Sequence, residues 1–350
     1  MSRALWGAIL ALVAAFAVAP VLLSHDVYSY VDYARLGVVH GLDPYVHPPA
    51  AVPSDPIYPR VEWTDVPSAY GPLFTLAGYP LAWLPVDAAV AALKALAALS
   101  VLALAALVAR LAPSRGVAPL PAAAFVALNP LVLIHVVGGA HNDGLAMLVA
   151  MLGVAATLTA CEATAGAAFV AAFAVKLPAG LAAPFALAST ARLPLFPHRR
   201  VEKAAIVPAT RMLAGASAMA LAIGLGAYLA FEWNWLNALS LAGENQDRTS
   251  HMSIPITTAR LTGLDQTAVR AVAIASYALV FTGLLAWTWR GADWLRAAAW
   301  ATFALLLATA WLLPWYLIWA LPLVALSRDR PLQLLTLALT LYQLPARMPL

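Results

Sequence analysis

The sequence predicts an all-α protein that crosses the membrane many times, and three observations support this. Hydrophobic residues make up 63% of the chain and charged residues only 10%, a composition far from that of soluble domains. Apolar runs of about 18 residues or more recur along the chain, as membrane-spanning helices require. These Leu- and Ala-rich runs lack the strict alternation of membrane β-strands, so helices rather than a closed barrel are expected.

The first apolar run covers residues 4–23 and follows Arg3. A cleaved signal peptide is the alternative interpretation of such a run. The run is longer than the core of a typical signal peptide, and no small-residue cleavage site clearly follows it. It is therefore interpreted as a retained first span that starts on the cytoplasmic side, because basic residues favour that side.

A polar segment follows this span, and residues 24–87 are expected to form a long first extracytoplasmic loop. Six carboxylates and only two arginines lie within 24–73: Asp26, Asp32, Asp43, Asp55, Glu62 and Asp65, with Arg35 and Arg60. Residues 70–85 are apolar, but glycines and prolines break the run and it is short for a crossing. An interfacial or re-entrant helix is expected there instead.

The later spans are expected at residues 88–111, 118–137, 143–161, 212–233, 268–289, 297–313, 315–327 and 331–346, with a hairpin of two short arms at 164–175 and 177–190. Together with the first span they make about 11 crossings. This arrangement places most of the 20 Lys and Arg residues on the cytoplasmic side, among them Arg115, Arg199 and Lys203. Residues 234–267 form a second extracytoplasmic loop, and the chain 1–350 is expected to be one domain.

The composition also argues against several partners and cofactors. The net charge of +4 comes from basic residues scattered at span ends rather than from a basic stripe, so no nucleic-acid partner is expected. No strong metal-ligand spacing occurs, so no metal or other cofactor is predicted, and a divalent metal stays open as an alternative. The single cysteine, Cys161, cannot form an intrachain disulfide and is expected to be buried.

Asp26 is the first candidate for chemistry, because it follows the first span beside His25, Tyr28 and Tyr30. A carboxylate that merely ends a helix in the headgroup region is one interpretation. The other is a general base that deprotonates an acceptor hydroxyl at the membrane surface.

Two further features stand out in otherwise apolar surroundings. Residues 138–144 (Gly-Gly-Ala-His-Asn-Asp-Gly) join two spans on the side of Asp26. A simple turn needs no His141, so His141, Asn142 and Asp143 are candidates to bind a sugar, a phosphate or a metal. Lys176 interrupts an apolar run before Leu177-Pro178. Such a lysine can snorkel to an interface, or it can present its ammonium to a phosphate.

Three aromatic motifs complete the pattern. They are 41–45 (Gly-Leu-Asp-Pro-Tyr), 70–73 (Tyr-Gly-Pro-Leu) and 314–322 (Pro-Trp-Tyr-Leu-Ile-Trp-Ala-Leu-Pro). Taken singly, they are typical of turns and of interfacial aromatic belts.

Taken together and in this order, with Asn129-Pro130 before the 138–143 turn, these motifs resemble the GT-C integral-membrane glycosyltransferases. More narrowly, they resemble the polyprenol-phosphomannose-dependent α-1,6-mannosyltransferases that build bacterial lipoglycan mannan. The resemblance covers residues 4–327, and the Asn-Pro to Gly-Gly-Ala-His-Asn-Asp block is its most specific part. Leu313 stands where this family has a histidine before the Pro-Trp-Tyr block.

The resemblance implies an inverting transfer of a sugar, mannose in the family, from a polyprenyl-phosphate carrier to a glycan or glycolipid acceptor. The site would lie on the extracytoplasmic side of the cell membrane. Asp26 matches the position of the family's base. The residues near the substrates would be His25, Tyr28, Asp43, Tyr45, Tyr70, His141, Asn142, Asp143, Lys176, Trp315 and Tyr316.

Two other classes of function compete with this interpretation. A multi-pass transporter or flippase of lipid-linked sugars would place coupling carboxylates near the middle of the membrane on facing repeats. Here the acids gather in an outer loop, and no internal repeat is apparent. A non-catalytic membrane scaffold would leave Lys176 and the 138–144 turn unexplained.

Overall fold

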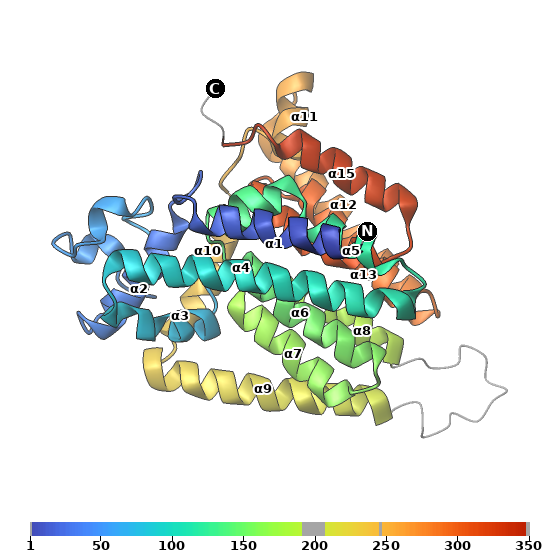
Figure 1. The fold of residues 1–350 in the computed structure, drawn as a ribbon, viewed down its shortest axis with the longest axis horizontal. Coiled ribbons are helices and arrows are strands. Elements are labelled where there is room, and N and C mark those ends of the chain that lie inside the picture. The colour runs from blue at the N-terminus through green and yellow to red at the C-terminus, as the bar shows by residue number, and fades with distance from the viewer. Residues whose placement is uncertain (1, 191–206, 245–246, 348–350) are drawn as a thin grey trace.

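The computed structural model describes residues 2–190, 207–244 and 247–347, and every regular element in these ranges is helical (Figure 1). The predicted all-α fold is therefore confirmed for this part of the chain. Arg199 and Lys203, expected at an inner connection, lie outside the described residues. The α-helices in the first half are α1 (Ser2–Val18), α2 (Asp26–Val38), α3 (Pro72–Gly78), α4 (Val86–Leu111), α5 (Pro119–Ala127), α6 (Asp143–Leu158), α7 (Glu162–Val175) and α8 (Ala183–Thr190).

The second half of the chain is also helical. Its α-helices are α9 (Val207–Phe231), α10 (Asn237–Glu244), α11 (Ile254–Thr262), α12 (Gln266–Trp289), α13 (Trp294–Ala308), α14 (Leu321–Leu326) and α15 (Arg330–Gln343). Two further segments matter for the site: the π-helical segment η5 (Val132–Gly138) and the 3-10 helix η9 (Pro314–Trp319).

Three described helices are long and apolar enough to cross a membrane: α4 with its extension to Arg115, α9 and α12. The pair α5 and η5, bent by 63°, makes a fourth if it is counted as one span. The expected number of about 11 crossings is thus not confirmed. The other apolar helices that the structure describes have only 10–17 residues.

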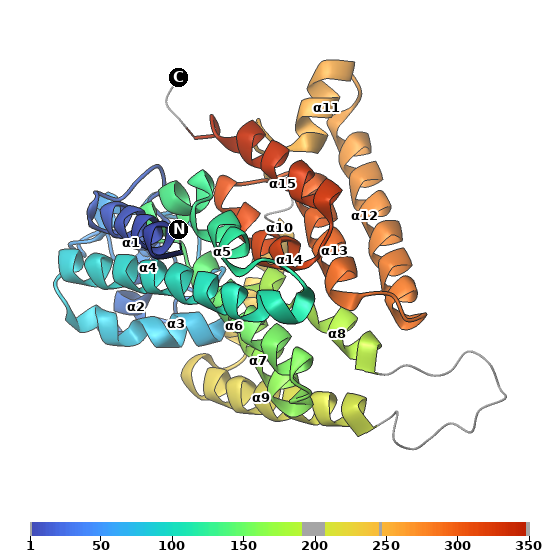
Figure 2. The same ribbon diagram turned by 45° about the vertical axis from the view of Figure 1, so that its right-hand side comes forward.

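Helix α4 passes through the middle of the molecule, with α1 on one side and α6, α7 and α9 in succession on the other (Figure 1). Glycines allow the closest approach, between α7 and α9. A Cβ atom on Gly166 would lie 1.9 Å from the carbonyl oxygen of Met212, and one on Gly215 would lie 1.9 Å from that of Ala163. The two backbones therefore touch, as small residues permit between membrane helices. Helix α12 lies at the edge of the molecule, against α13 (Figure 2).

Two short segments, residues 70–85 and the connection that contains Cys161, can be compared with the expectations from the sequence. Residues 70–85 form α3 and a 3-10 turn, Tyr79–Trp83, which pack against α2. The predicted buried state of Cys161 is wrong, because this residue is exposed in the connection between α6 and α7.

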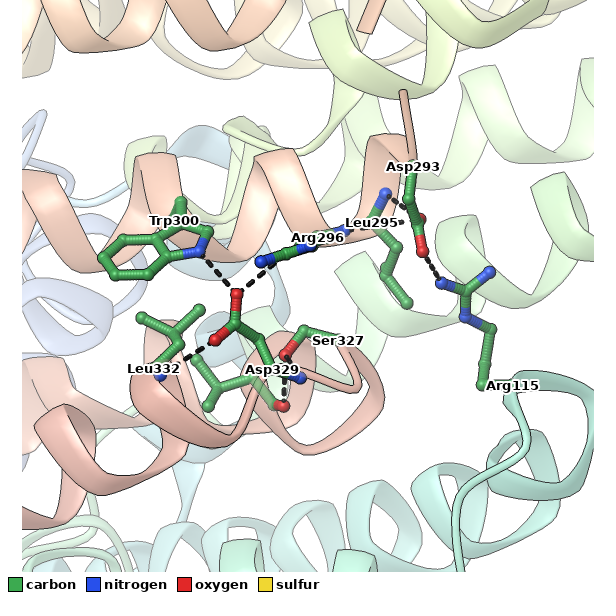
Figure 3. Close-up of polar contacts among 9 residues, drawn as sticks. Arg115, Asp293, Leu295, Arg296, Trp300, Ser327, Asp329 and Leu332 are labelled. Atoms are coloured by element: carbon green, nitrogen blue, oxygen red, sulfur yellow. Dashed lines mark hydrogen bonds and ion pairs between the residues drawn. The ribbon is translucent and has the colours of Figure 1, made fainter. Parts of the chain in front are cut away.

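A polar network joins the starts of α13 and α15 to the connection after α4 (Figure 3). Asp293 caps α13 and pairs with Arg115. Asp329 caps α15 by accepting a hydrogen bond from the Leu332 amide, and it also accepts from Arg296 Nε and Trp300 Nε1, both at 2.8 Å. Burial opposes ionisation of Asp329, but these donors outweigh it and lower the pKa of its carboxyl.

Asp329→Ala is expected to lower the free energy of unfolding by about 2 kcal/mol or more, because it removes a helix cap and leaves the half-buried Trp300 N–H without its acceptor. Since the folded-state pKa is lowered, the contribution is present above the unfolded carboxyl's pKa and is lost as the pH falls. Chemical unfolding in detergent measures the change. Asp265→Ala removes an exposed cap of α12 whose one acceptor contact, among the described residues, is with the Ala268 amide, so a loss of about 1 kcal/mol is expected. Equal losses for the two variants would contradict the role of the network.

Candidate active site

A cavity of about 520 Å³ lies where the loop after α2, the α7–α8 connection and η9 meet. Its walls are largely apolar and aromatic. Asp26 and Lys176, which lie 150 residues apart in the chain, both line it. Asp26 is the one carboxylate among the described lining residues. The structure therefore joins the two candidates through a single cavity.

Asp26 is the first residue of α2, so its carboxylate lies at a helix N-terminus, where negative charge is favoured. Its Oδ1 accepts a hydrogen bond from Trp63 Nε1 at 3.0 Å, and its Oδ2 lies 3.5 Å from His141 Nδ1. Burial raises the pKa of the Asp26 carboxyl, and the Trp63 hydrogen bond partly offsets that rise. A carboxylate with a raised pKa and a fixed orientation is suited to accept a proton.

Lys176 follows the last residue of α7 and has extended backbone angles, φ −155° and ψ 124°. This break in the helix turns the side chain toward the cavity. Its Nζ donates to Asp143 Oδ2 at 2.7 Å and to Asn142 Oδ1 at 3.3 Å. Because an ammonium has three N–H donors, one is left for another partner. Lys176 thus faces the cavity with much of its charge already balanced by Asp143.

The 138–144 turn supports the cavity from behind. His141, Asn142 and Asp143 are buried and do not line the cavity. His141 stacks on Trp315 with ring centroids 3.8 Å apart, and Asp143 Oδ1 accepts from Trp319 Nε1 at 2.6 Å. The three residues of this turn that were expected to bind substrate therefore contact Asp26, Lys176 and η9 instead. They hold those groups in position.

A buried lysine fixes this turn. Lys94, in α4, donates from Nζ to the Gly138 carbonyl at 2.8 Å and to the Pro20 carbonyl at 3.3 Å. The Leu22 amide also donates to the Gly138 carbonyl. A Cβ on Gly139 would lie 2.5 Å from the His135 carbonyl, so the close-packed turn needs glycine there. The chain after α1 and the end of η5 are thereby locked together beside Asp26.

The other predicted residues fall into two groups. Tyr70, Trp315 and Tyr316 line the cavity. Asp43, Tyr45, His25 and Tyr28 do not.

Asp43 and Tyr45 hold the first loop in shape. Asp43 Oδ2 accepts from Asn234 Nδ2 at 3.0 Å, and the Tyr45 hydroxyl donates to the Tyr70 carbonyl at 2.9 Å. His25 and Tyr28 pack edge to face with ring centroids 5.7 Å apart. These four side chains therefore shape the loop near the cavity and do not form its wall.

Sequence reasoning missed several residues around the cavity: Trp63, Lys94, Arg248, Trp311, Trp319 and Arg347. Lys94 gave the same signal as Lys176, a lysine within an apolar run. Trp319 belongs to the 314–322 motif, which taken alone is typical of an aromatic belt. Trp63, Arg248 and Arg347 gave no signal of their own, because only the fold brings these distant segments to one cavity. Among the residues that the structure describes, no three His, Cys, Asp or Glu side chains are placed to hold a metal ion.

Comparison with known proteins finds a family match in the first part of the chain, which contains the candidate site residues Asp26 and Lys176. A family model described as "Alpha-(1->6)-mannopyranosyltransferase, N-terminal domain" matches residues 1–192, more than half of the chain. This segment contains Asp26, the 138–144 turn and Lys176. No solved structure shows significant similarity to the chain.

Several curated proteins resemble parts of the chain. One alpha-(1->6)-mannopyranosyltransferase of Mycobacterium tuberculosis is 33% identical over 39% of this chain and 24% of its own length. Alpha-(1->6)-mannopyranosyltransferase A of the same organism is 33% identical over 48% of this chain and 34% of its own length. A probable alpha-(1->6)-mannopyranosyltransferase of Mycolicibacterium smegmatis is 31% identical over 42% of this chain and 27% of its own length. The matched region thus spans about a quarter to a third of these relatives.

Proposed function

The chain belongs to the family of alpha-(1->6)-mannopyranosyltransferases, and from that premise we propose that it moves a mannosyl group from a polyprenyl-phosphate carrier to a glycan or glycolipid acceptor. The observation that carries the proposal is the cavity that Asp26 and Lys176 share. A membrane glycosyltransferase of the GT-C type needs a base for the acceptor, a cation near the donor phosphate and an apolar path for the lipid. The cavity walls offer residues for each role.

The reaction needs only one carboxylate if it inverts the anomeric centre. The acceptor oxygen attacks the sugar carbon and a new C–O bond forms. The bond from that carbon to the phosphate oxygen breaks, and its electron pair leaves with the polyprenyl phosphate. Asp26 takes the acceptor hydroxyl's proton as attack occurs. The phosphate is already a good leaving group, so no general acid is required.

Lys176 would lie near the departing phosphate and offset the negative charge that grows on it. Such fixed positive charge in a largely apolar cavity is a strong source of transition-state stabilisation. The third N–H of Lys176 is available for this contact, because Asp143 and Asn142 occupy the other two. The largely apolar remainder of the wall suits the prenyl chain.

We place this site on the extracytoplasmic side. Helix α4 has 26 residues, which extend about 39 Å at about 1.5 Å per residue, enough to cross a hydrocarbon core of about 30 Å. Its first residue follows the acid-rich first loop, and its end leads to Arg115 and the polar network (Figure 3). Basic residues favour the cytoplasmic side, and this supports an outer position for the loop and for Asp26.

Transfer from labelled polyprenyl-phosphate mannose to a panel of mannan-like acceptors, by the purified protein with and without a chelator, tests this function. Label is expected in the glycan. The same protein in liposomes provides the contrast: movement of a lipid-linked sugar across the bilayer, with no glycan made, would instead indicate a transporter or flippase.

Trp63→Phe is expected to move the acid limb of the pH profile of kcat/KM to higher pH. A base acts only when ionised, so activity falls as the pH drops through the raised pKa of Asp26. The indole N–H of Trp63 lowers that pKa, and phenylalanine keeps the ring while removing the donor. Trp300→Phe removes an indole hydrogen bond to Asp329 in the polar network and should leave the limb unchanged. An acid limb identical to the wild type in Trp63→Phe would contradict the role of Asp26.

A further inference from the structure

The described wall of the cavity carries three cations, Lys176, Arg248 and Arg347, against the single carboxylate of Asp26. Two of the cations have acidic partners. Lys176 pairs with Asp143 at 2.7 Å, and Arg347 lies 3.8 Å from Glu62. Arg248, by contrast, makes no ion pair with any carboxylate that the structure describes. Arg248 is therefore the cation of the described cavity wall that has no carboxylate paired with it.

Two indole rings hold the Arg248 guanidinium in place. Its Cζ lies 4.6 Å from the ring centroid of Trp63 and 5.4 Å from that of Trp311. These two rings pack edge to face with centroids 6.1 Å apart. Cation–π contacts of this kind fix a guanidinium without using its N–H donors. The donors of Arg248 are thus left for a ligand.

The segment that carries Arg248 is anchored beside the same wall. The Ser250 amide donates to the Ala310 carbonyl at 3.0 Å, and its hydroxyl donates to the Leu312 carbonyl at 2.7 Å. These bonds flank Trp311. The position of the guanidinium is therefore set before any ligand binds, which reduces the cost of ordering it on binding.

Trp63 links this cation to the proposed base. Its Nε1 donates to Asp26 Oδ1 while its ring packs against Arg248. The Trp63 indole therefore contacts both groups, and it is the side chain that lies between Arg248 and Asp26. A ligand whose sugar carbon faces Asp26 can place an adjoining anionic group against Arg248.

We propose that Arg248 is the principal residue that binds the phosphate of the lipid-linked donor in this cavity, and that Lys176 is the second cation near that phosphate. This inference rests on the proposed function. The donor is a phosphodiester with one negative charge, and the departing polyprenyl phosphate gains another as the sugar–oxygen bond breaks. A guanidinium offers paired N–H donors whose fork matches phosphate oxygens. Arg248 would thus bind the donor and stabilise the charge that develops on leaving.

Binding of farnesyl phosphate and of farnesol, measured side by side on the purified protein, tests the assignment without requiring turnover. The wild type is expected to prefer the phosphate, and Arg248→Gln to reduce that preference by about 10-fold or more, since a charged hydrogen bond is lost. Arg248→Lys should keep part of it. Arg260→Gln removes the same charge from an exposed position outside this cavity and should change nothing.

Chemical modification of wild-type protein tests the same point without a variant that must fold. Farnesyl phosphate, but not farnesol, is expected to slow reaction of Arg248 with phenylglyoxal, as peptide mass spectrometry would detect, and to leave Arg260 unprotected. A folded Arg248→Gln protein with the wild-type preference, or an Arg248 that the phosphate does not protect, would overturn the assignment. A wild type that binds farnesol as tightly as farnesyl phosphate would instead overturn the lipid-phosphate donor itself.

Discussion

Asp26→Asn is expected to lower kcat for mannosyl transfer by about 10²- to 10⁴-fold, the usual contribution of general acid–base catalysis, while the protein stays folded. Asparagine keeps the size of the side chain and can still accept the hydrogen bond from Trp63. It cannot accept the proton of the acceptor hydroxyl. Initial rates with saturating donor and acceptor measure the loss, and a thermal melt in detergent checks the fold.

Asp32→Asn is the matched control, because Asp32 lies six residues further along α2 and is buried without lining the cavity. Burial, with Asp55 nearby, raises the pKa of Asp32 to about 7, so a neutral amide should be tolerated at this position. Transfer by this variant is expected to match the wild type. Normal turnover by Asp26→Asn, or an equal loss in both variants, would remove Asp26 as the base.

Lys176→Met is expected to destabilise the protein by about 3 kcal/mol or more, because it leaves a buried carboxylate without its cation. The Asp143 side chain is fully buried, and Lys176 Nζ is its ion-pair partner at 2.7 Å. Trp319 still donates to Asp143 but supplies no charge. Chemical unfolding of the detergent-solubilised protein measures the change.

The double variant Lys176→Met with Asp143→Asn separates the two roles of the lysine. Removing both charges should recover most of the lost stability, since no unpaired carboxylate remains buried. Transfer should not recover, because the cation near the donor phosphate is still missing. Recovery of both stability and activity would show that Lys176 has only a structural role.

A few residues of the cavity wall could be predicted from local patterns in the sequence. Asp26 and Lys176 were conspicuous because ionisable side chains are rare in or beside apolar runs. The 138–144 turn was conspicuous because it carries more polar groups than a connection needs. These signals are local, so they can be recognised without knowledge of the fold. Two of the side chains that they identify, Asp26 and Lys176, line one cavity.

Other features depend on contacts between distant segments and left no local signal. No local pattern indicates that Asp143 pairs with Lys176 behind the cavity wall, or that Trp63, Arg248 and Trp311 lie together. The number of membrane spans was difficult to predict for a different reason. Hydropathy measures the length of apolar runs, but it does not show where a helix breaks within a run, and several of the described apolar helices have only 10–17 residues.

The central claim, that one carboxylate suffices in this cavity because the transfer inverts the sugar, is tested most directly by the anomeric configuration of the product. Purified protein would be given polyprenyl-phosphate mannose of known configuration and a defined acceptor, and the new linkage would be determined by NMR. We expect a glycosidic bond of configuration opposite to that of the donor's sugar–phosphate bond. Retention of the donor's configuration would require a second nucleophilic group and would contradict it.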